Sequence, residues 1–177
     1  MIGLDISPEG EAEPMAGCYD RYYSMDICKD LPDIKADLVI SRPVFEHLRD
    51  SRAAAMNCHG LLRPGGRTLH LIPCRFALPC IANQCLGPGI GKRLKRLIHG
   101  KERYYRAYYD SCTPKSMGAV FAGTGFTNVS CTPSYCNDYL RMFAPAYVLD
   151  VLRQCAMKML GEDSFCDAFM VYAEKKA

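Results

Sequence analysis

The sequence ADLVIS, at residues 36–41, is a short apolar run ending in a serine, and it predicts a buried β-strand. Residues 49–62 follow with apolar side chains at near-helical spacing, and this pattern stops at Pro64-Gly65-Gly66. A second apolar run, at residues 68–72, predicts the next strand. A strand, a helix, a glycine turn and a strand at this spacing are typical of parallel strands joined by a crossover helix, so we expect an α/β fold.

The same reading extends to both ends of the chain. Thr113 precedes Pro114 at the start of an apolar segment, which is the pattern of an N-cap followed by proline at the first helical position. We expect further strands at residues 2–7, 22–27, 127–132 and 167–174, and helices at residues 113–123 and 144–160.

Composition restricts the class of protein. The 177 residues are enough for one domain, and 49% hydrophobic with 23% charged residues is the balance of an ordinary globular chain. A formal net charge of +3 is too small to indicate binding of nucleic acid through the field of the whole molecule, so we expect no nucleic-acid partner.

Targeting and metal-binding signals are both weak. No run of about 18 apolar residues occurs, and the first residues lack the pattern of a secretory signal, so we expect a cytoplasmic protein. Eleven cysteines are spread along the chain without a CxxC pair. This spacing favours buried, reduced thiols over a zinc site, and we predict no metal.

Six short motifs in order resemble the class I S-adenosylmethionine-dependent methyltransferases, specifically the methyltransferase type 11-like family. They are GLDIS (3–7), DI (26–27), LP (31–32), DLVIS (37–41), VFEHL (44–48) and LRPGG (62–66). The resemblance covers residues 1–73, and AGTGF at 122–126 also looks like the family's last helix and strand. It implies a Rossmann-like, mostly parallel twisted sheet with flanking helices and an antiparallel last strand.

The resemblance implies S-adenosyl-L-methionine as the cofactor. Asp5, at the end of a strand, would accept hydrogen bonds from both ribose hydroxyls. Ile6 would lie against one face of the adenine, Asp26 would accept from the adenine amino group, and the Ile27 backbone amide would donate to the ring.

The methionine half would be bordered by Ser41 and Arg42, which leave the strand at residues 36–41. His47 is a weak candidate for a general base, because histidine is the residue type most often used for that role. Methyl transfer depends mainly on alignment of the two reactants, so the sequence assigns no firm catalytic residue.

One part of the family pattern is missing. In the family, a strand and a glycine-rich cofactor loop precede the acid strand, and nothing before Met1 supplies them here. We therefore expect an N-terminally truncated fold. The absent strand would lie centrally, between the Asp5 strand and the Ser41 strand, so exposed sheet edges and self-association through them are expected.

We expect a single methyltransferase-like domain in three parts: a cofactor-side core (1–73), an insertion or cap (74–112), and the C-terminal helices with the last two strands (113–177). Within the insertion, the glycine-rich turn at residues 87–92 is interpreted as a flexible joint, because it follows no buried strand and Pro88 lacks an amide hydrogen.

The basic segment Lys92–Lys101 carries a narrow apolar stripe beside its cationic face. It could contact an anionic membrane surface or a phosphorylated substrate, or be a solvated helix face. Nearby tyrosines could stack on a ring or pack in the core: Tyr104, Tyr105, Tyr108 and Tyr109. Peripheral membrane contact is thus one option for this cytoplasmic chain.

The predicted function is methyl transfer from S-adenosylmethionine to a small-molecule or lipid-linked acceptor, impaired in the truncated chain. Displacement would occur directly at the methyl carbon. The first alternative is a non-catalytic interaction module, either a pseudoenzyme or a fragment. A nucleotide-dependent oxidoreductase is a second alternative, which Glu46-His47-Leu48 and Pro64-Gly65-Gly66 argue against.

Overall fold

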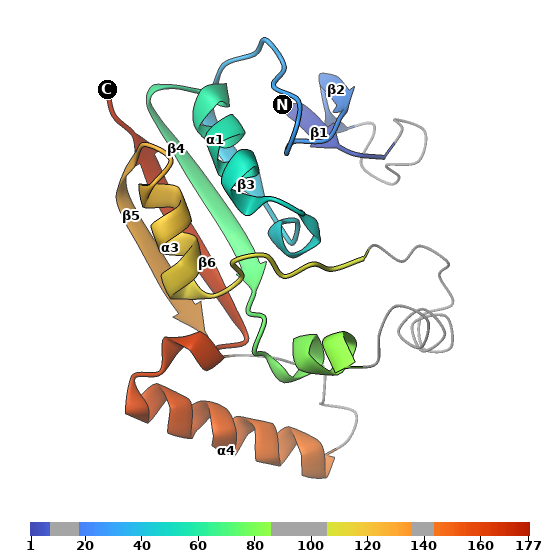
Figure 1. The fold of residues 1–177 in the computed structure, drawn as a ribbon, viewed down its shortest axis with the longest axis vertical. Helices are drawn as coiled ribbons and strands as arrows, with labels where there is room; N and C mark the ends of the chain where they lie inside the picture. Colours follow the sequence, from blue (N-terminus) through green and yellow to red (C-terminus); the bar gives the residue numbers. More distant parts are fainter. Residues whose placement is uncertain (8–17, 86–105, 136–143) are drawn as a thin grey trace.

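Two sheets and their flanking helices make up the computed structural model, which describes residues 1–7, 18–85, 106–135 and 144–177 (Figure 1). Strand β1 (Ile2–Asp5) pairs in parallel with β2 (Arg21–Ser24). The second sheet has the strand order β3–β4–β6–β5. The predicted α/β class is confirmed.

The four-stranded sheet is mixed. Its strands are β3 (Ala36–Ser41), β4 (Leu62–Pro73), β5 (Phe126–Ser134) and β6 (Ala168–Lys175). Strand β3 runs parallel to β4, whereas β6 is antiparallel to both β4 and β5. This arrangement confirms the expected antiparallel last strand.

The helices match their predicted positions to within about two residues. They are α1 (Ser51–Leu61), α3 (Pro114–Ala122) and α4 (Ala144–Leu160), with short 3-10 turns at η3 (Phe45–His47) and η4 (Asp163–Phe165). The Thr113 side chain accepts a hydrogen bond from the Ser116 amide, so the predicted cap of α3 is confirmed.

One face of the four-stranded sheet is covered by α1 and α3, and the core lies between these layers (Figure 1). The Phe121 ring lies at the centre of an aromatic group, with ring centroids 5.8 Å from Phe45, 5.4 Å from His70 and 5.2 Å from Phe126. Phe121 is fully buried. The core therefore joins η3, β4, α3 and β5 into one unit.

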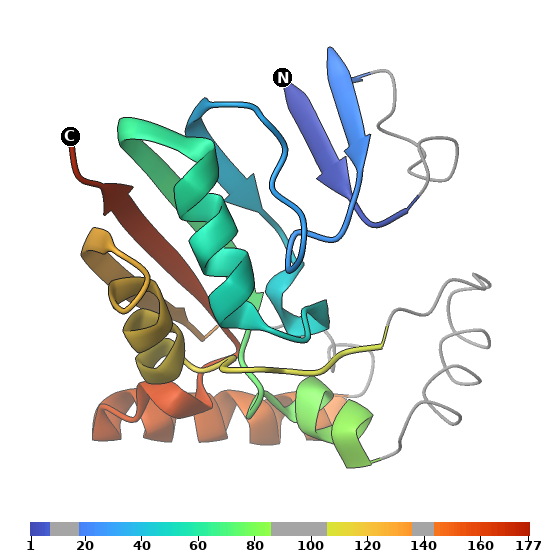
Figure 2. The same ribbon diagram turned by 45° about the horizontal axis from the view of Figure 1, so that its top comes forward.

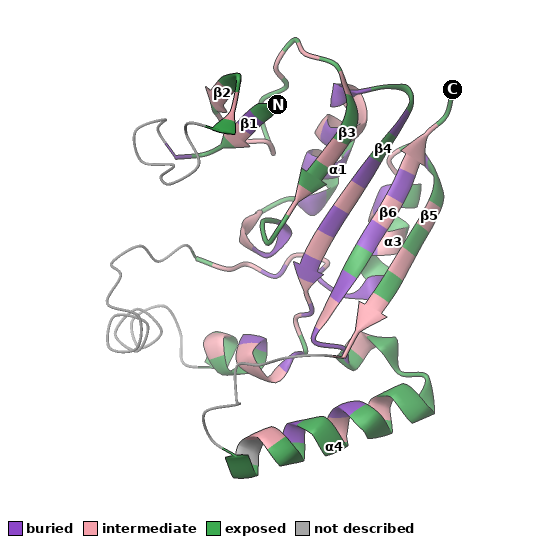
Figure 3. Cartoon of the chain, turned by 180° about the vertical axis from the view of Figure 1, so that it is seen from behind, coloured by how far each residue is buried: buried purple, intermediate pink, exposed green. Residues whose placement is uncertain are grey.

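The opposite face of this sheet carries exposed side chains, as Figure 3 shows. Leu38 and Ile40 of β3 are 56% and 64% exposed, and Met170 of β6 is also exposed. Residues 36–41 form the predicted strand, but the prediction that it is buried is wrong for the side that carries Leu38 and Ile40. This side is exposed because α1 and α3 cover the opposite face of the sheet. In the strand expected at residues 2–7, Ile2 and Ile6 are exposed as well.

In the part of the chain that the structure describes, no strand of one sheet pairs with a strand of the other, and Figure 2 shows the β1–β2 pair apart from the larger sheet. Within the described ranges, β1 pairs only with β2 and β3 pairs only with β4. Each strand thus has one unpaired edge, in line with the expected effect of an absent central strand. Truncation of the chain itself stays a prediction.

The carboxyl ends of β6 and α1 are joined by a lysine. Lys175 Nζ donates to the His59 carbonyl at 2.9 Å and to the Leu62 carbonyl at 2.8 Å. A cation at the C-terminus of a helix satisfies carbonyl groups that have no partner within the helix. The last residue of β6 therefore caps the C-terminus of α1, which lies more than a hundred positions earlier in the chain.

The described cysteines are free thiols. Five are buried, namely Cys58, Cys74, Cys80, Cys112 and Cys166, while Cys18, Cys85 and Cys155 are exposed. Burial raises the pKa of Cys58 to about 12. The predicted burial of thiols therefore holds for part of the set.

Several predictions from the insertion fall outside the described residues: the turn at 87–92, the basic segment Lys92–Lys101, Tyr104 and Tyr105. In the part of the chain that the structure describes, no helix is both long and apolar enough to cross a membrane.

Candidate functional site

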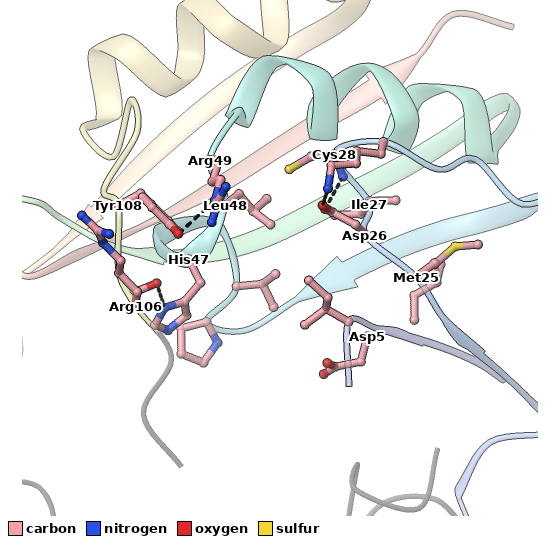
Figure 4. Close-up of a pocket in the computed structure, with 15 residues that line it drawn as sticks. Asp5, Met25, Asp26, Ile27, Cys28, His47, Leu48, Arg49, Arg106 and Tyr108 are labelled. Atoms are coloured by element: carbon pink, nitrogen blue, oxygen red, sulfur yellow. Dashed lines mark hydrogen bonds and ion pairs between the residues drawn. The ribbon is translucent and has the colours of Figure 1, made fainter. Parts of the chain in front are cut away.

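A cavity of about 500 Å³ lies at the carboxyl end of β1 (Figure 4). Its wall comes from the end of β1, the turn after β2, the residues around η3 and the segment that begins at Arg106. The lining residues used below are Asp5, Ile6, Asp26, Ile27, His47, Arg49, Arg106 and Tyr108. Ligands of open α/β sheets bind beyond the carboxyl ends of the parallel strands, so the position is typical of a binding site.

Asp5 is the last residue of β1, and its carboxylate is oriented by the turn that follows. Its Oδ1 accepts a hydrogen bond of 2.8 Å from the Ser7 amide. The Ser7 carbonyl in turn accepts from the Tyr22 hydroxyl at 2.9 Å, which ties this turn to β2. Among the described residues Oδ2 of Asp5 has no hydrogen-bond partner, so this oxygen can accept from a ligand. The adjacent Ile6 side chain is exposed and apolar.

The turn after β2 supplies the second carboxylate. Asp26 Oδ1 accepts from the Cys28 amide at 3.1 Å, and Oδ2 lies 3.0 Å from Lys29 Nζ. The Lys29 hydrogen bond lowers the pKa of Asp26, with the Cys28 amide acting in the same direction against the effect of burial. Asp26 is therefore an anion at neutral pH, and a carboxylate has lone pairs left for a further donor.

The Ile27 backbone presents a donor at the same position. Its carbonyl accepts from Asn57 Nδ2 at 2.8 Å, which attaches the turn to α1. No hydrogen bond between described residues uses the Ile27 amide. The structure thus brings together Asp5, Ile6, Asp26 and Ile27, the four residues assigned by resemblance to the nucleoside.

His47 lies in η3 on the same cavity. Its Nδ1 is 3.0 Å from the Arg106 carbonyl oxygen, and a carbonyl can only accept, so Nδ1 carries the hydrogen. The neutral ring then has its lone pair on Nε2, which is 3.6 Å from Glu46 Oε1. In this tautomer Nε2 is the nitrogen that can accept a proton, as a general base must.

Backbone contacts fix η3 against the later segment. The Glu46 carbonyl accepts from the Tyr108 amide at 2.7 Å and from the Tyr109 amide at 3.0 Å. Residues 106–109 are thereby held beside His47, although about 60 positions separate them in sequence.

Sequence reasoning missed the two arginines of the cavity. Arg49 Nε donates to the Tyr108 hydroxyl at 2.9 Å, and the Cζ atoms of Arg49 and Arg106 both lie 5.2 Å from the centre of the Tyr108 ring. Arg49 directly follows the motif VFEHL, and this adjacency was the available signal. Arg106 gives no local signal, because only the fold brings it to His47.

Ser41 and Arg42 do not line this cavity. Ser41 pairs with His70 in the β3–β4 register, and its Oγ lies 2.7 Å from His70 Nδ1, toward the core. The assignment of Ser41 and Arg42 to the methionine half of a cofactor stays a prediction.

Comparison with known proteins relates this chain to methyltransferases. Residues 1–70 match the sequence model of a methyltransferase domain, and no curated protein matches the chain. The solved structure of the N-methyltransferase NodS from Bradyrhizobium japonicum, in complex with S-adenosylhomocysteine, is similar at 14% identity and a TM-score of 0.55, over 99% of this chain and 66% of that one. The fold is that of the class I methyltransferases.

Two other solved structures have a similar fold. A SAM-dependent methyltransferase from Archaeoglobus fulgidus is 16% identical with a TM-score of 0.54, over 98% of this chain and 75% of that one. A protein described as a possible exported protein from Bordetella parapertussis is 15% identical with a TM-score of 0.50, over 99% of this chain and 53% of that one. The chain thus spans about half to two thirds of the first relatives it matches. Within this methyltransferase fold, the cavity lies at the ends of β1 and β2.

Proposed function

We propose that the cavity binds the nucleoside half of S-adenosylmethionine and that the chain carries out methyl transfer from it to an acceptor. The observation that supports this most strongly is the convergence of Asp5, Ile6, Asp26 and Ile27 on one cavity at the carboxyl ends of two parallel strands.

The donors and acceptors of this cavity fit an adenosine group. The Asp5 carboxylate has an oxygen available for the ribose hydroxyls, and the exposed Ile6 side chain offers an apolar surface for one face of a purine. Asp26 would accept from the exocyclic amine while the Ile27 amide donates to a ring nitrogen. An adenine presents this pair side by side on one edge, with the amino donor and the ring-nitrogen acceptor bonded to the same carbon.

S-adenosylmethionine would supply an activated methyl group on a sulfonium. The chain's part would be to hold the nucleoside, align the acceptor and receive a proton where the acceptor carries one. His47 Nε2 is positioned for that last role, since Nδ1 is engaged by the Arg106 carbonyl. The acceptor, whether a small molecule or lipid-linked, would enter between His47 and Tyr108.

Calorimetric titration of S-adenosylhomocysteine into the purified chain tests this proposal. We expect binding to the wild type and at least about tenfold weaker binding to Asp5→Asn, which keeps the shape of the side chain but removes the charge. Asp37→Asn is the matched control, because Asp37 is an exposed carboxylate of β3 that bonds Arg63 outside the cavity. Failure of a folded wild-type chain to bind, or equal binding by all three proteins, would refute the proposal.

A non-catalytic module remains the competing proposal, and one observation favours it. The described residues that line the cavity include no glycine-rich loop for the methionine half. Binding of S-adenosylhomocysteine without turnover of any acceptor tested would support that alternative. Binding of adenosine alone with the same affinity would support it further, because the methionine half would then contribute nothing.

A further inference from the structure

The cavity has ends of opposite charge. Asp5 and Asp26 lie at the ends of β1 and β2, whereas Arg49 and Arg106 lie near η3. Lys29, the other cation of the wall, is engaged by Asp26 at 3.0 Å. The positive charge that remains is therefore concentrated where the acceptor would enter.

Neither arginine is neutralised in the described part of the chain. No carboxylate there lies within salt-bridge distance of either guanidinium, and their terminal nitrogens make no hydrogen bond to a described residue. Arg49 uses only Nε, which donates to the Tyr108 hydroxyl at 2.9 Å. Several N–H donors thus remain directed to solvent or to a ligand.

Tyr108 contacts both of these cations. Each guanidinium carbon lies 5.2 Å from the centre of its ring, within the range of a cation–π contact. Figure 4 shows the Tyr108 side chain between Arg49 and Arg106. Two positive charges on the wall of one cavity repel each other, and an anion bound in the cavity by their N–H groups relieves that repulsion.

We propose that Arg49 and Arg106 form an oxyanion subsite that recognises a phosphate or carboxylate group on the methyl acceptor. This inference rests on the proposed function, since it assigns the acceptor end of the same cavity. The planar guanidinium matches the spacing of two oxygen atoms on such groups, which favours charge-assisted, bidentate hydrogen bonds. The Tyr108 contacts would orient the Arg49 fork before the ligand arrives, and so reduce the entropy lost on binding.

Titration with inorganic phosphate, and separately with acetate, tests the subsite at constant ionic strength. Both titrations are made with and without saturating S-adenosylhomocysteine. We expect saturable binding to the wild type and about tenfold weaker binding to Arg49→Gln and to Arg106→Gln. Arg52→Gln is the matched control, because Arg52 is an exposed arginine at the same end of α1 that does not line the cavity.

The outcomes separate this proposal from the previous one. Loss of anion binding in the two variants but not in the control supports the subsite, and the tighter of the two anions indicates the acceptor group. Absence of anion binding, or an equal effect of all three substitutions, overturns it. The affinity for S-adenosylhomocysteine is measured on the same proteins, and its loss together with anion binding in Arg49→Gln and Arg106→Gln would assign the arginines to the cofactor's carboxylate and overturn the acceptor subsite. A wild-type chain that does not bind S-adenosylhomocysteine would refute nucleoside binding, and the anion titration would still test the arginines.

Discussion

His70 illustrates how one buried side chain fixes its neighbours. Thr68 Oγ1 donates its single hydrogen to the Val39 carbonyl at 3.2 Å, so it accepts from His70 Nε2 at 2.5 Å. Nδ1 of the neutral ring is then an acceptor, and Ser41 Oγ donates to it at 2.7 Å. The chain of hydrogen bonds runs from β3 to β4 and holds the Ser41 hydroxyl toward the core.

Burial lowers the pKa of His70 from 6.5 to about 3. The folded protein therefore keeps the imidazole neutral in mild acid, whereas the unfolded chain binds a proton below a pH of about 6.5. Protonation of the unfolded state then favours unfolding. We expect the free energy of unfolding to fall by about 2 kcal/mol as the pH is lowered from near 6.5 to about 5.

Urea denaturation of the wild type and of His70→Gln over this pH range checks the expectation. The variant should be less stable at neutral pH but show a flatter pH dependence. His59→Gln is the matched control. Burial lowers the pKa of His59 as well, but this histidine is only half-buried, so the variant should keep most of the acid sensitivity. The same slope in the wild type and His70→Gln would contradict the assignment.

At the scale of elements, α1 holds the turn after β2 through the hydrogen bond from Asn57 to the Ile27 carbonyl, and its own first turn is anchored from two directions. Asp50 Oδ1 accepts from the Ala53 amide at 2.8 Å as the N-cap. Asp110 Oδ2 accepts from the Ser51 amide at 2.8 Å, and the Asp110 carbonyl accepts from the Ser51 hydroxyl at 2.8 Å. Two acidic side chains at a helix N-terminus also interact favourably with its dipole.

We expect Asp50→Ala to lower the free energy of unfolding by about 1 kcal/mol, because it leaves an amide of the first turn without its acceptor. Asp37→Ala should change stability by less, since the exposed ion pair of Asp37 with Arg63 contributes little. Thermal or chemical denaturation measures both. An Asp50→Ala variant as stable as the wild type would show that water replaces the cap without cost.

The elements were largely predictable because their signals are local. Thr113 and Pro114 predicted the start of α3, and the apolar runs at residues 2–7, 22–27 and 36–41 predicted three strands in the correct order, whereas η3 was not predicted. Strand β2 is shorter than expected and ends at Ser24, because Asp26 accepts backbone hydrogen bonds from Lys29 and Asp30 and so begins a turn. Turn geometry of this kind competes with strand extension in ways that an apolar run does not show.

The cavity was only half predictable, for a physical reason. Asp5, Ile6, Asp26 and Ile27 lie in short motifs. Tyr108, in contrast, reaches the cavity through a backbone hydrogen bond to Glu46, and Arg106 through the contact of its carbonyl with His47. Ser41 lies at the end of a strand as expected, yet the orientation of its side chain depends on a histidine 29 positions later. Long-range contacts determine which way these side chains point, and periodicity carries no information about them.

At the scale of the whole molecule, the division into two sheets leaves backbone groups of β1 and β3 without strand partners in the described ranges. The exposed face beside β3 adds apolar surface at Leu38 and Ile40. Unpaired strand edges next to apolar surface promote association between chains.

We therefore expect light scattering to give a mass above the 19.8 kDa of one chain, increasing with concentration. Ile40→Lys should shift the distribution toward the monomer, because it places a charge on the exposed face of β3. Met56→Lys is the control, since Met56 is similarly exposed on α1, which covers the other face. A monomer at all concentrations, or equal effects of both substitutions, would count against association through this region.

The position of β6 has a consequence for the order in which the chain acquires its structure during synthesis. β6 lies between β4 and β5, so neither of these earlier strands has its hydrogen-bonding neighbour on that side until residues 168–175 leave the ribosome. The same residues bring Lys175 to the end of α1. A nascent chain halted before Ala168 would hold all the described residues of the cavity but lack the strand that joins β4 to β5, so these two strands would stay accessible to chaperones until β6 has been made.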